Sequence, residues 1–324
     1  MRPLNLFAVA VAAMLVAPAQ EPQETPTIKV EVDVVNILCS VRDKRGSLIS
    51  TLGKDDFIVK EDGKAQDIRY FARESDLPLT LGLLVDVSKS QEHLIEIERR
   101  AAVQFFSQVL RKKDMAFLIS FGPEVELLQD YTNSQTLLRN GLDELHVRGA
   151  VGGPLPGPVP TISQPRGTVL HDAVYLASNE KLRGEVGRKA IVLITDGIDT
   201  GSRMKLEQAV EAAQKADAIV YSIYYYDPSA YYQGGFSFGG GNDSALRKMS
   251  EETGGRLFKV SKKNTLDDIF KQIQEEMRSQ YSIGYSPVNP AKDGSFRRLE
   301  VDTARKDLKV QARKGYYAVK AGSS

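Results

Sequence analysis

Five side chains with oxygen donor atoms lie in three loops: four follow apolar runs that the sequence predicts to be buried strands, and the fifth, Thr168, lies just before a predicted helix. The five residues are Asp86, Ser88, Ser90, Thr168 and Asp196. The first three follow the pattern D-x-S-x-S at the end of the run 80–87, and the last directly follows the run 190–195. Parallel strands end at one edge of a sheet, where ligands of open α/β sheets usually bind. We therefore expect these side chains to converge at one sheet edge.

The types of donor atom indicate which metal ion such a site would bind. Carboxylate and hydroxyl oxygens are hard donors, and hard donors in a small octahedral shell suit Mg²⁺ best, with Mn²⁺ or Ca²⁺ as alternatives. The three histidines (His93, His146 and His171) and the single cysteine, Cys39, show no metal-ligand spacing. The sequence therefore predicts an all-oxygen site for a divalent cation, preferably Mg²⁺.

The order of the five donors resembles the metal-ion-dependent adhesion site of von Willebrand factor type A (VWA) domains, and every position of that motif is matched. The layout of the chain also looks like that of bacterial exported proteins described as VWFA-related, in which short β segments flank the A domain. The resemblance implies direct cation ligands at Ser88, Ser90 and Thr168. It further implies that Asp86 and Asp196 bind through water, or that one of them binds directly.

These features favour a binding module over an enzyme. Neutral hydroxyl ligands leave the cation much of its positive charge, so an open coordination position would attract an Asp or Glu side chain of a partner protein. Two other functions stay open: a metal-dependent hydrolase, because carboxylates and Mg²⁺ also serve phosphoryl chemistry, and a structural subunit of a cell-envelope complex. No general base, activated nucleophile or phosphate-binding glycine loop accompanies the motif, which argues against the hydrolase. A metal-free domain whose hydroxyls cap helices is a further alternative.

Strands and helices alternate over 79–280, which is also the extent of the resemblance. This alternation predicts an α/β fold with an open, mostly parallel sheet and helices on both faces, the Rossmann-like architecture of a VWA domain. We expect strands at 80–87, 115–121, 124–129, 190–195, 218–224 and 255–260. We expect helices at 94–110, 134–145, 169–178, 205–216, 245–253 and 265–280. The buried stripe of the first helix is expected to contain Leu94, Ile97, Ala101, Phe105 and Val109.

Segments of alternating strand pattern without helices lie on either side of this region, at 27–76 and 281–319. In the first segment Ile37, Cys39 and Val41 fall on one face, which makes the cysteine a small buried core residue. Each segment by itself would be small and would expose its strand edges. We therefore expect the two segments to pair into one small β-sandwich, with the α/β domain inserted between them.

Two loops are expected to shape the face around the cation. The loop 149–167, rich in glycine and proline, leads directly into Thr168. The loop 225–243 follows the predicted strand 218–224 and combines tyrosine and phenylalanine with glycine. Tyrosine with glycine and serine is typical of adaptable binding loops, and a disordered insertion is the alternative.

The first nineteen residues have the pattern of a secretory signal peptide, with Arg2, an apolar run at 4–17 and small residues before Gln20. An uncleaved anchor helix is the alternative, and 20–26 is interpreted as a polar linker. Cleavage would leave 42 of the 43 basic residues against 42 acidic ones, a balance unlike that of a nucleic-acid-binding protein. No later apolar stretch approaches the ~18 residues of a membrane span. We expect an exported protein (periplasmic, cell-surface or secreted) without a membrane span in its mature form.

Overall fold

The computed structural model describes residues 34–73, 77–147, 167–233, 236–237 and 242–319 of the 324-residue chain. The predicted signal peptide at 1–19, the linker at 20–26 and nearly all of the loop 149–167 lie outside the described residues. Within the described ranges, no helix is long and apolar enough to cross a membrane.

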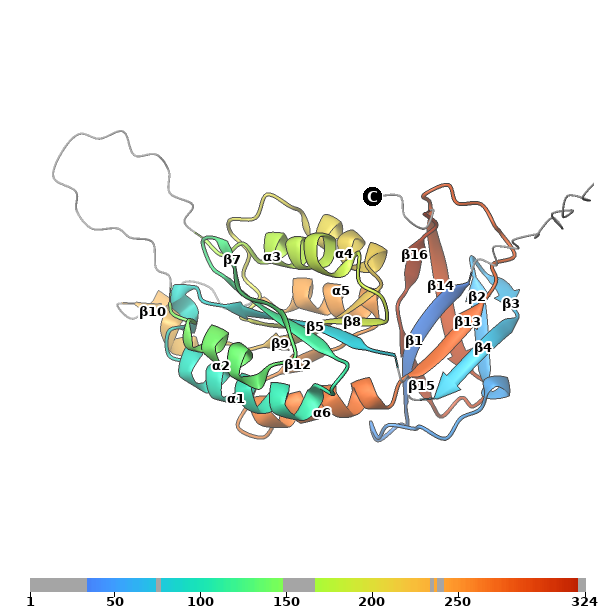
Figure 1. The fold of residues 1–324 in the computed structure, drawn as a ribbon, viewed down its shortest axis with the longest axis horizontal. Helices are drawn as coiled ribbons and strands as arrows, with labels where there is room; N and C mark the ends of the chain where they lie inside the picture. Colours follow the sequence, from blue (N-terminus) through green and yellow to red (C-terminus); the bar gives the residue numbers. More distant parts are fainter. Residues whose placement is uncertain (1–33, 74–76, 148–166, 234–235, 238–241, 320–324) are drawn as a thin grey trace, which may run out of the picture. The chain divides into compact units, whose positions relative to one another are not determined.

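A six-stranded sheet forms the centre of the α/β region, with the strand order β12-β9-β8-β5-β6-β7 (Figure 1). Its strands are β5 (Leu79–Asp86), β6 (Met115–Phe121), β7 (Val125–Thr132), β8 (Arg188–Thr195), β9 (Ala218–Tyr224) and β12 (Leu257–Lys259). Strand β7 runs antiparallel to β6, and the other paired strands are parallel. The prediction of an open, mostly parallel α/β sheet is therefore confirmed.

The central strands are buried along their whole length and apolar in their middle because helices cover both faces of the sheet. Every residue of β5 and of β8 is buried. Successive side chains of a strand point to opposite faces, so Leu83 packs in the core on one face and Leu84 in the core on the other. A sheet covered on both sides thus needs a continuous apolar run rather than an alternating one.

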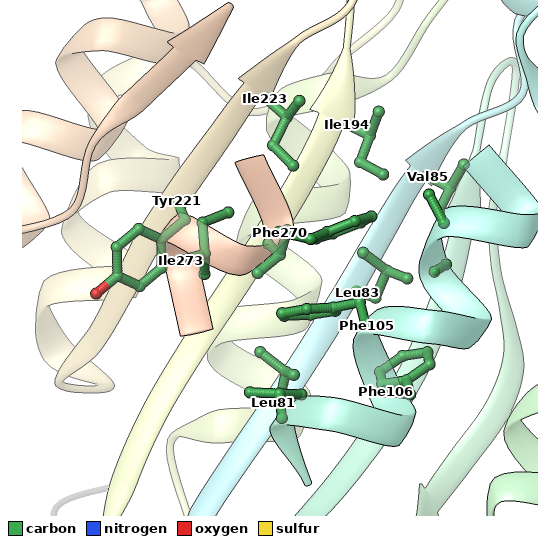
Figure 2. Packing of buried hydrophobic residues seen from close by; sticks show 14 of the residues in the cluster. Leu81, Leu83, Val85, Phe105, Phe106, Ile194, Tyr221, Ile223, Phe270 and Ile273 are labelled. Atoms are coloured by element: carbon green, nitrogen blue, oxygen red, sulfur yellow. The ribbon is translucent and has the colours of Figure 1, made fainter. Parts of the chain in front are cut away.

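The described α-helices divide between the two faces of the sheet (Figure 1). One face carries α1 (Ile95–Val109), α2 (Gln135–Asp143) and α6 (Leu266–Arg278), and the other carries α3 (Leu170–Leu176), α4 (Leu206–Lys215) and α5 (Ser244–Thr253). Figure 2 shows the first core, in which the ring of Phe105 on α1 stacks on the ring of Phe270 on α6, with centroids 4.4 Å apart. The helix predicted at 169–178 is α3 followed by a π-helical turn, Ala177–Leu182.

The direction of strand addition changes beside β5. The chain passes from β5 to β6 and β7 on one side and returns to β8 on the other side of β5. The connections after β5 and β8 therefore leave in opposite directions, which opens a crevice at the carboxyl ends of these strands. Ligands of open α/β sheets usually bind in that crevice.

Two four-stranded antiparallel sheets, with the orders β15-β1-β13-β4 and β16-β14-β2-β3, combine strands from both ends of the described chain. Their strands are β1 (Val35–Arg42), β2 (Phe57–Glu61), β3 (Lys64–Gln66), β4 (Ile68–Arg73), β13 (Tyr281–Tyr285), β14 (Phe296–Thr303), β15 (Lys309–Ala312) and β16 (Gly315–Tyr317). Strand β1 pairs with β13, and β2 pairs with β14. The two sheets share one core, to which Ile37 and Cys39 of one sheet and Val59 and Leu299 of the other contribute. The domain limits stay a prediction.

A buried carboxylate fixes α6 to the first of these sheets. Glu276 on α6 accepts hydrogen bonds from Arg42 Nη2 at 2.5 Å, Arg256 Nη1 at 3.2 Å and Gln311 Nε2 at 2.9 Å. Arg42 ends β1, and Gln311 lies on β15. All of these residues belong to one compact unit, Asp33–Ser324. The helix that leads into β13 is thus anchored to β1, the strand with which β13 pairs, and to β15 of the same sheet.

Candidate metal centre

The five predicted donors lie at the carboxyl edge of β5 and β8. Asp86 is the last residue of β5, and Asp196 directly follows β8. Ser88 and Ser90 lie at the start of the short helix η2 (Lys89–Gln91), and Thr168 precedes α3. Both aspartates and the threonine are buried. Three separate loops thus bring the donors to one sheet edge.

Hydrogen bonds connect three of the donors directly. The hydroxyl oxygens of Ser88 and Ser90 are 3.0 Å apart, and the Ser90 hydroxyl donates to Asp196 Oδ2 at 2.6 Å. Thr168 and the two serines also line one cleft with a volume of about 420 Å³. Residues that are more than 100 positions apart in the chain therefore meet at the mouth of one cleft.

A second set of hydrogen bonds fixes the orientation of both carboxylates. Asp86 Oδ1 accepts from the backbone N–H of Ser88 at 2.9 Å, and Asp86 Oδ2 accepts from the hydroxyl of Thr195 at 2.5 Å. Asp196 Oδ1 accepts from the backbone N–H of Ile198 at 3.1 Å. Because Thr195 is the residue before Asp196, its hydroxyl ties the end of β8 to the end of β5.

The turn after Asp196 requires glycine. Gly197 has a φ of +77°, and a Cβ at this position would lie 2.1 Å from the backbone oxygen of Asn242. A larger residue would both strain the left-handed backbone and clash with that oxygen. The backbone N–H of Asn242 also donates to the backbone oxygen of Asp196 at 3.1 Å. The D-G pair therefore marks a place where another segment packs closely against the site.

The two aspartates affect each other electrostatically. Burial and then the charge of Asp196 raise the pKa of Asp86 to about 7, while the hydrogen bonds from Ser88 and Thr195 act to lower it. A divalent cation at this edge would relieve the repulsion between the carboxylates. The residues fit such a cation, because the carboxylates and hydroxyls are hard oxygen ligands already held together.

A cation at this edge would depend on the hydroxyl groups. In the part of the chain that the structure describes, no group of three or more His, Cys, Asp or Glu side chains is placed to hold a metal ion. Asp86 and Asp196 would supply only two side-chain ligands. Ser88, Ser90 and Thr168 would therefore have to complete the set.

A third carboxyl group near this edge, that of Glu98, was not anticipated from the sequence. The expectation that Ile97 belongs to the buried stripe of α1 is wrong, because Ile97 is 40% exposed whereas Glu98 is 0% exposed. Helix α1 begins at Ile95, and Glu98 and Ala102 follow Ile95 on the face that packs on the sheet. The signal in the sequence was that Glu98 lies at helical spacing between Ile95 and Ala102, which are both buried and apolar.

The walls of the cleft come from four segments of the chain, which follow β5, precede α3, follow β8 and follow β9. Besides Ser88, Ser90 and Thr168, the lining residues are Lys89, Glu92, His93, Ile198 and Ala230. His93 precedes α1, so a histidine without ligand spacing in the sequence nevertheless borders the cleft. Ala230 belongs to the short helix η4 (Pro228–Tyr231), which brings the loop 225–243 to the cleft. The side chains of 231–241 lie outside the described residues.

Comparison with known proteins gives one family match. Residues 159–272 match the family described as von Willebrand factor type A domain. This range includes Thr168 and Asp196, whereas the D-x-S-x-S segment lies before it. No curated protein sequence matched the chain.

Solved structures with low sequence identity align with about two thirds of this chain. The conserved hypothetical protein BatB from Bacteroides thetaiotaomicron is 17% identical with a TM-score of 0.46, and the match covers 61% of this chain and 97% of BatB. Proximal thread matrix protein 1 from the mussel byssus, with a zinc-occupied MIDAS motif, is 13% identical with a TM-score of 0.47, over 67% of this chain and 49% of that one. The SpRpn10 VWA domain is 15% identical with a TM-score of 0.40, over 60% and 95% of the two chains.

The family match and the architecture agree on the kind of domain. The matched range contains β8, β9 and β12 of the central sheet and helices from both of its faces. The remaining strands complete a largely parallel six-stranded sheet, and the antiparallel sheets are additional to it. The chain therefore contains a domain of the von Willebrand factor type A fold, with residues 159–272 matching that family.

Proposed function

We propose that this chain binds a divalent cation, preferably Mg²⁺, through Asp86, Ser88, Ser90, Thr168 and Asp196, and binds an acidic side chain of a partner protein through that cation. The observation that carries the proposal is the hydrogen-bonded set of Ser88, Ser90 and Asp196 at the mouth of a cleft. VWA domains commonly mediate protein interactions, which is consistent with a binding role.

Each residue of the centre has a distinct part in this proposal. A bound divalent cation would supply positive charge that attracts a carboxylate. Ser88 and Ser90 would bind as neutral ligands and leave that charge largely uncompensated. Asp86 and Asp196 are oriented by Thr195 and by backbone N–H groups, so they would need little rearrangement to hold the cation or its water.

The cleft supplies the remaining contacts with the partner. His93, Ile198 and Ala230 border the same cleft as the serines, so they would contact the chain on either side of a bound acidic residue. The cleft would contribute mainly its shape and apolar contacts. Its wall also carries the basic side chains of Lys89 and His93 and the acidic side chain of Glu92. The protein partner is therefore expected to present an Asp or Glu on a segment that is narrow enough to enter the cleft.

The proposal is one of binding rather than catalysis. The hydroxyl groups of Ser88 and Ser90 hydrogen-bond to each other, and that of Ser90 also donates to Asp196; neither bonds to a histidine that could act as a general base. We also propose that the protein acts outside the cytoplasm, on the evidence of the signal-peptide pattern at 1–19.

Selection of peptides tests the proposed function. A random peptide library displayed on phage is selected on the full chain in Mg²⁺ and eluted with EDTA. We expect the eluted peptides to share an Asp or Glu whose replacement by Asn or Gln abolishes binding. The variant Ser90→Ala should lose these peptides, whereas Ser107→Ala, which changes an exposed serine of α1, should keep them. Peptides that bind equally in EDTA, or without an acidic residue, would contradict the proposal.

A further inference from the structure

Glu98 is a buried carboxyl group that accepts no hydrogen bond from any residue in the described part of the chain. It lies near the start of α1, is 0% exposed, and neither of its side-chain oxygens has a hydrogen-bond partner. The charges that act on it most strongly are those of Asp86 and Asp196. Glu98 therefore lies within electrostatic range of the two carboxylates of the proposed centre.

A buried carboxyl group of this kind lowers the stability of the folded protein when no cation is bound. A buried carboxylate without a partner destabilises the folded state, and two further negative charges nearby increase that cost. Burial, followed by the charges of Asp86 and Asp196, raises the pKa of Glu98 well above its usual range. An uncharged side chain of the same shape would therefore stabilise the folded protein better than Glu98 does.

A second unpartnered oxygen lies in the same neighbourhood. Gln91 on η2 is fully buried, its Oε1 has no hydrogen-bond partner, and its Nε2 donates to the backbone oxygen of Tyr225 at 3.3 Å. The charge of Glu98 in turn raises the pKa of Tyr225, after the effect of burial. Gln91, one residue after Ser90, is thus a second buried side chain with an oxygen that accepts no hydrogen bond from the described residues, and Tyr225 is influenced by both Gln91 and Glu98.

We infer that Glu98 is a positioning residue of the cation centre, which does not bind the cation itself but whose negative charge strengthens cation binding from inside the domain. This inference rests on the proposed function. Glu98 does not line the cleft through which an acidic ligand would arrive. Its charge is therefore expected to act more strongly on the cation than on a carboxylate that arrives through the cleft. The proposed five ligands alone do not account for a buried carboxyl group at this position.

Calorimetric titration of Mg²⁺ into the full chain at about pH 8 tests the inference. We expect Glu98→Gln, which keeps the shape and removes the charge, to weaken Mg²⁺ binding at least tenfold, or about 1.4 kcal/mol. The matched control is Glu96→Gln on the same helix, where the side chain is exposed; its affinity should equal that of the unchanged protein. Glu98→Asp, which keeps the charge, should retain most of the affinity.

Urea unfolding in EDTA separates a charge effect from a structural one. If the inference is right, Glu98→Gln is at least as stable as the unchanged protein without metal, because it removes an unpartnered buried acid. A variant that loses both stability and Mg²⁺ affinity would contradict the inference, as would Glu98→Asp binding no better than Glu98→Gln. If the unchanged protein binds Mg²⁺ and Glu98→Gln binds it equally well, only this inference fails. If the unchanged protein binds no divalent cation, the proposed function fails as well.

Discussion

The carboxyl group of Asp86 is buried beside that of Asp196, and this makes the stability of the metal-free protein depend on pH. Its pKa is about 7 in the folded protein, compared with 3.8 as the ordinary value, so the folded state keeps a proton that the unfolded chain has released. The contribution of this proton to the free energy of unfolding is complete below about pH 4 and is lost as pH rises through 7. The free energy of unfolding falls by at most about 1.4 kcal/mol per pH unit for each group. Glu98, whose pKa is also raised, acts in the same direction.

Urea unfolding in EDTA between about pH 5 and pH 8 measures this dependence. We expect the free energy of unfolding to fall across the range and Asp86→Asn to show a smaller fall. Saturating Mg²⁺ should reduce the fall as well, since a cation favours the ionised carboxylates. A free energy of unfolding that stays level or rises with pH in EDTA would count against the arrangement of carboxyl groups described here.

Cys39 offers a test of burial at the level of a single side chain. It lies on β1 in the shared core of the antiparallel sheets, and burial raises its pKa to about 12. At pH 8 only on the order of one thiol in 10⁴ would be ionised, and the thiolate is the reactive form. We expect almost no reaction with Ellman's reagent in the native protein and complete reaction in urea. Rapid labelling of the native protein would show that this core is open.

Single residues differ in how far the sequence could predict them. The spacing of Ser88 and Ser90, together with Asp196 after an apolar run, was enough to place them at one edge. The inward position of Glu98 was not predictable in the same way, because apolar periodicity favours Ile97 for a buried position. The phase of α1 is set by how the whole helix packs on the sheet, and a shift of one residue exchanges the two side chains.

At the level of elements, α6 is joined to the antiparallel sheets through Glu276. Its fully buried carboxylate accepts from Arg42, Arg256 and Gln311. Replacing it by alanine leaves two guanidinium groups without their acceptor, so we expect Glu276→Ala to lower the free energy of unfolding by about 3–5 kcal/mol. Urea denaturation of the full chain measures the loss.

The neighbouring Glu275 provides the matched control for this helix, because it is exposed. Glu275→Ala should change the free energy of unfolding by no more than about 0.5 kcal/mol. Equal effects of the two substitutions would mean that the carboxylate of Glu276 does not anchor α6.

Most elements of the α/β region follow from periodicity and apolar runs. The strands β6 and β9 match their predicted limits, and α6 differs by one or two residues at each end. The π-helical turn Ala177–Leu182 could not be predicted, because six residues are too few to distinguish the i→i+5 spacing of a π turn from the spacing of an α-helix. The pairing of β1 between β13 and β15 was also beyond the sequence, since an alternating pattern fits many neighbours equally well.

At the level of the whole molecule, a ligand that binds only the folded state must stabilise it. If Mg²⁺ binds as proposed, a concentration of about 100 times its Kd raises the free energy of unfolding by about 2.7 kcal/mol. Thermal unfolding followed by circular dichroism should therefore show a higher midpoint in Mg²⁺ than in EDTA. Ser88→Ala should lose most of this increase, whereas Ser107→Ala should keep it. An equal increase in both variants would place the cation elsewhere.

The most direct test is an anomalous difference map from crystals of the full chain grown with Mn²⁺, which substitutes for Mg²⁺ in oxygen sites and scatters anomalously. The account predicts one strong peak at the carboxyl ends of β5 and β8, within about 2.0–2.4 Å of the hydroxyl oxygens of Ser88, Ser90 and Thr168. Clear density for these side chains without a peak beside them, or a peak bound by other residues, would contradict it.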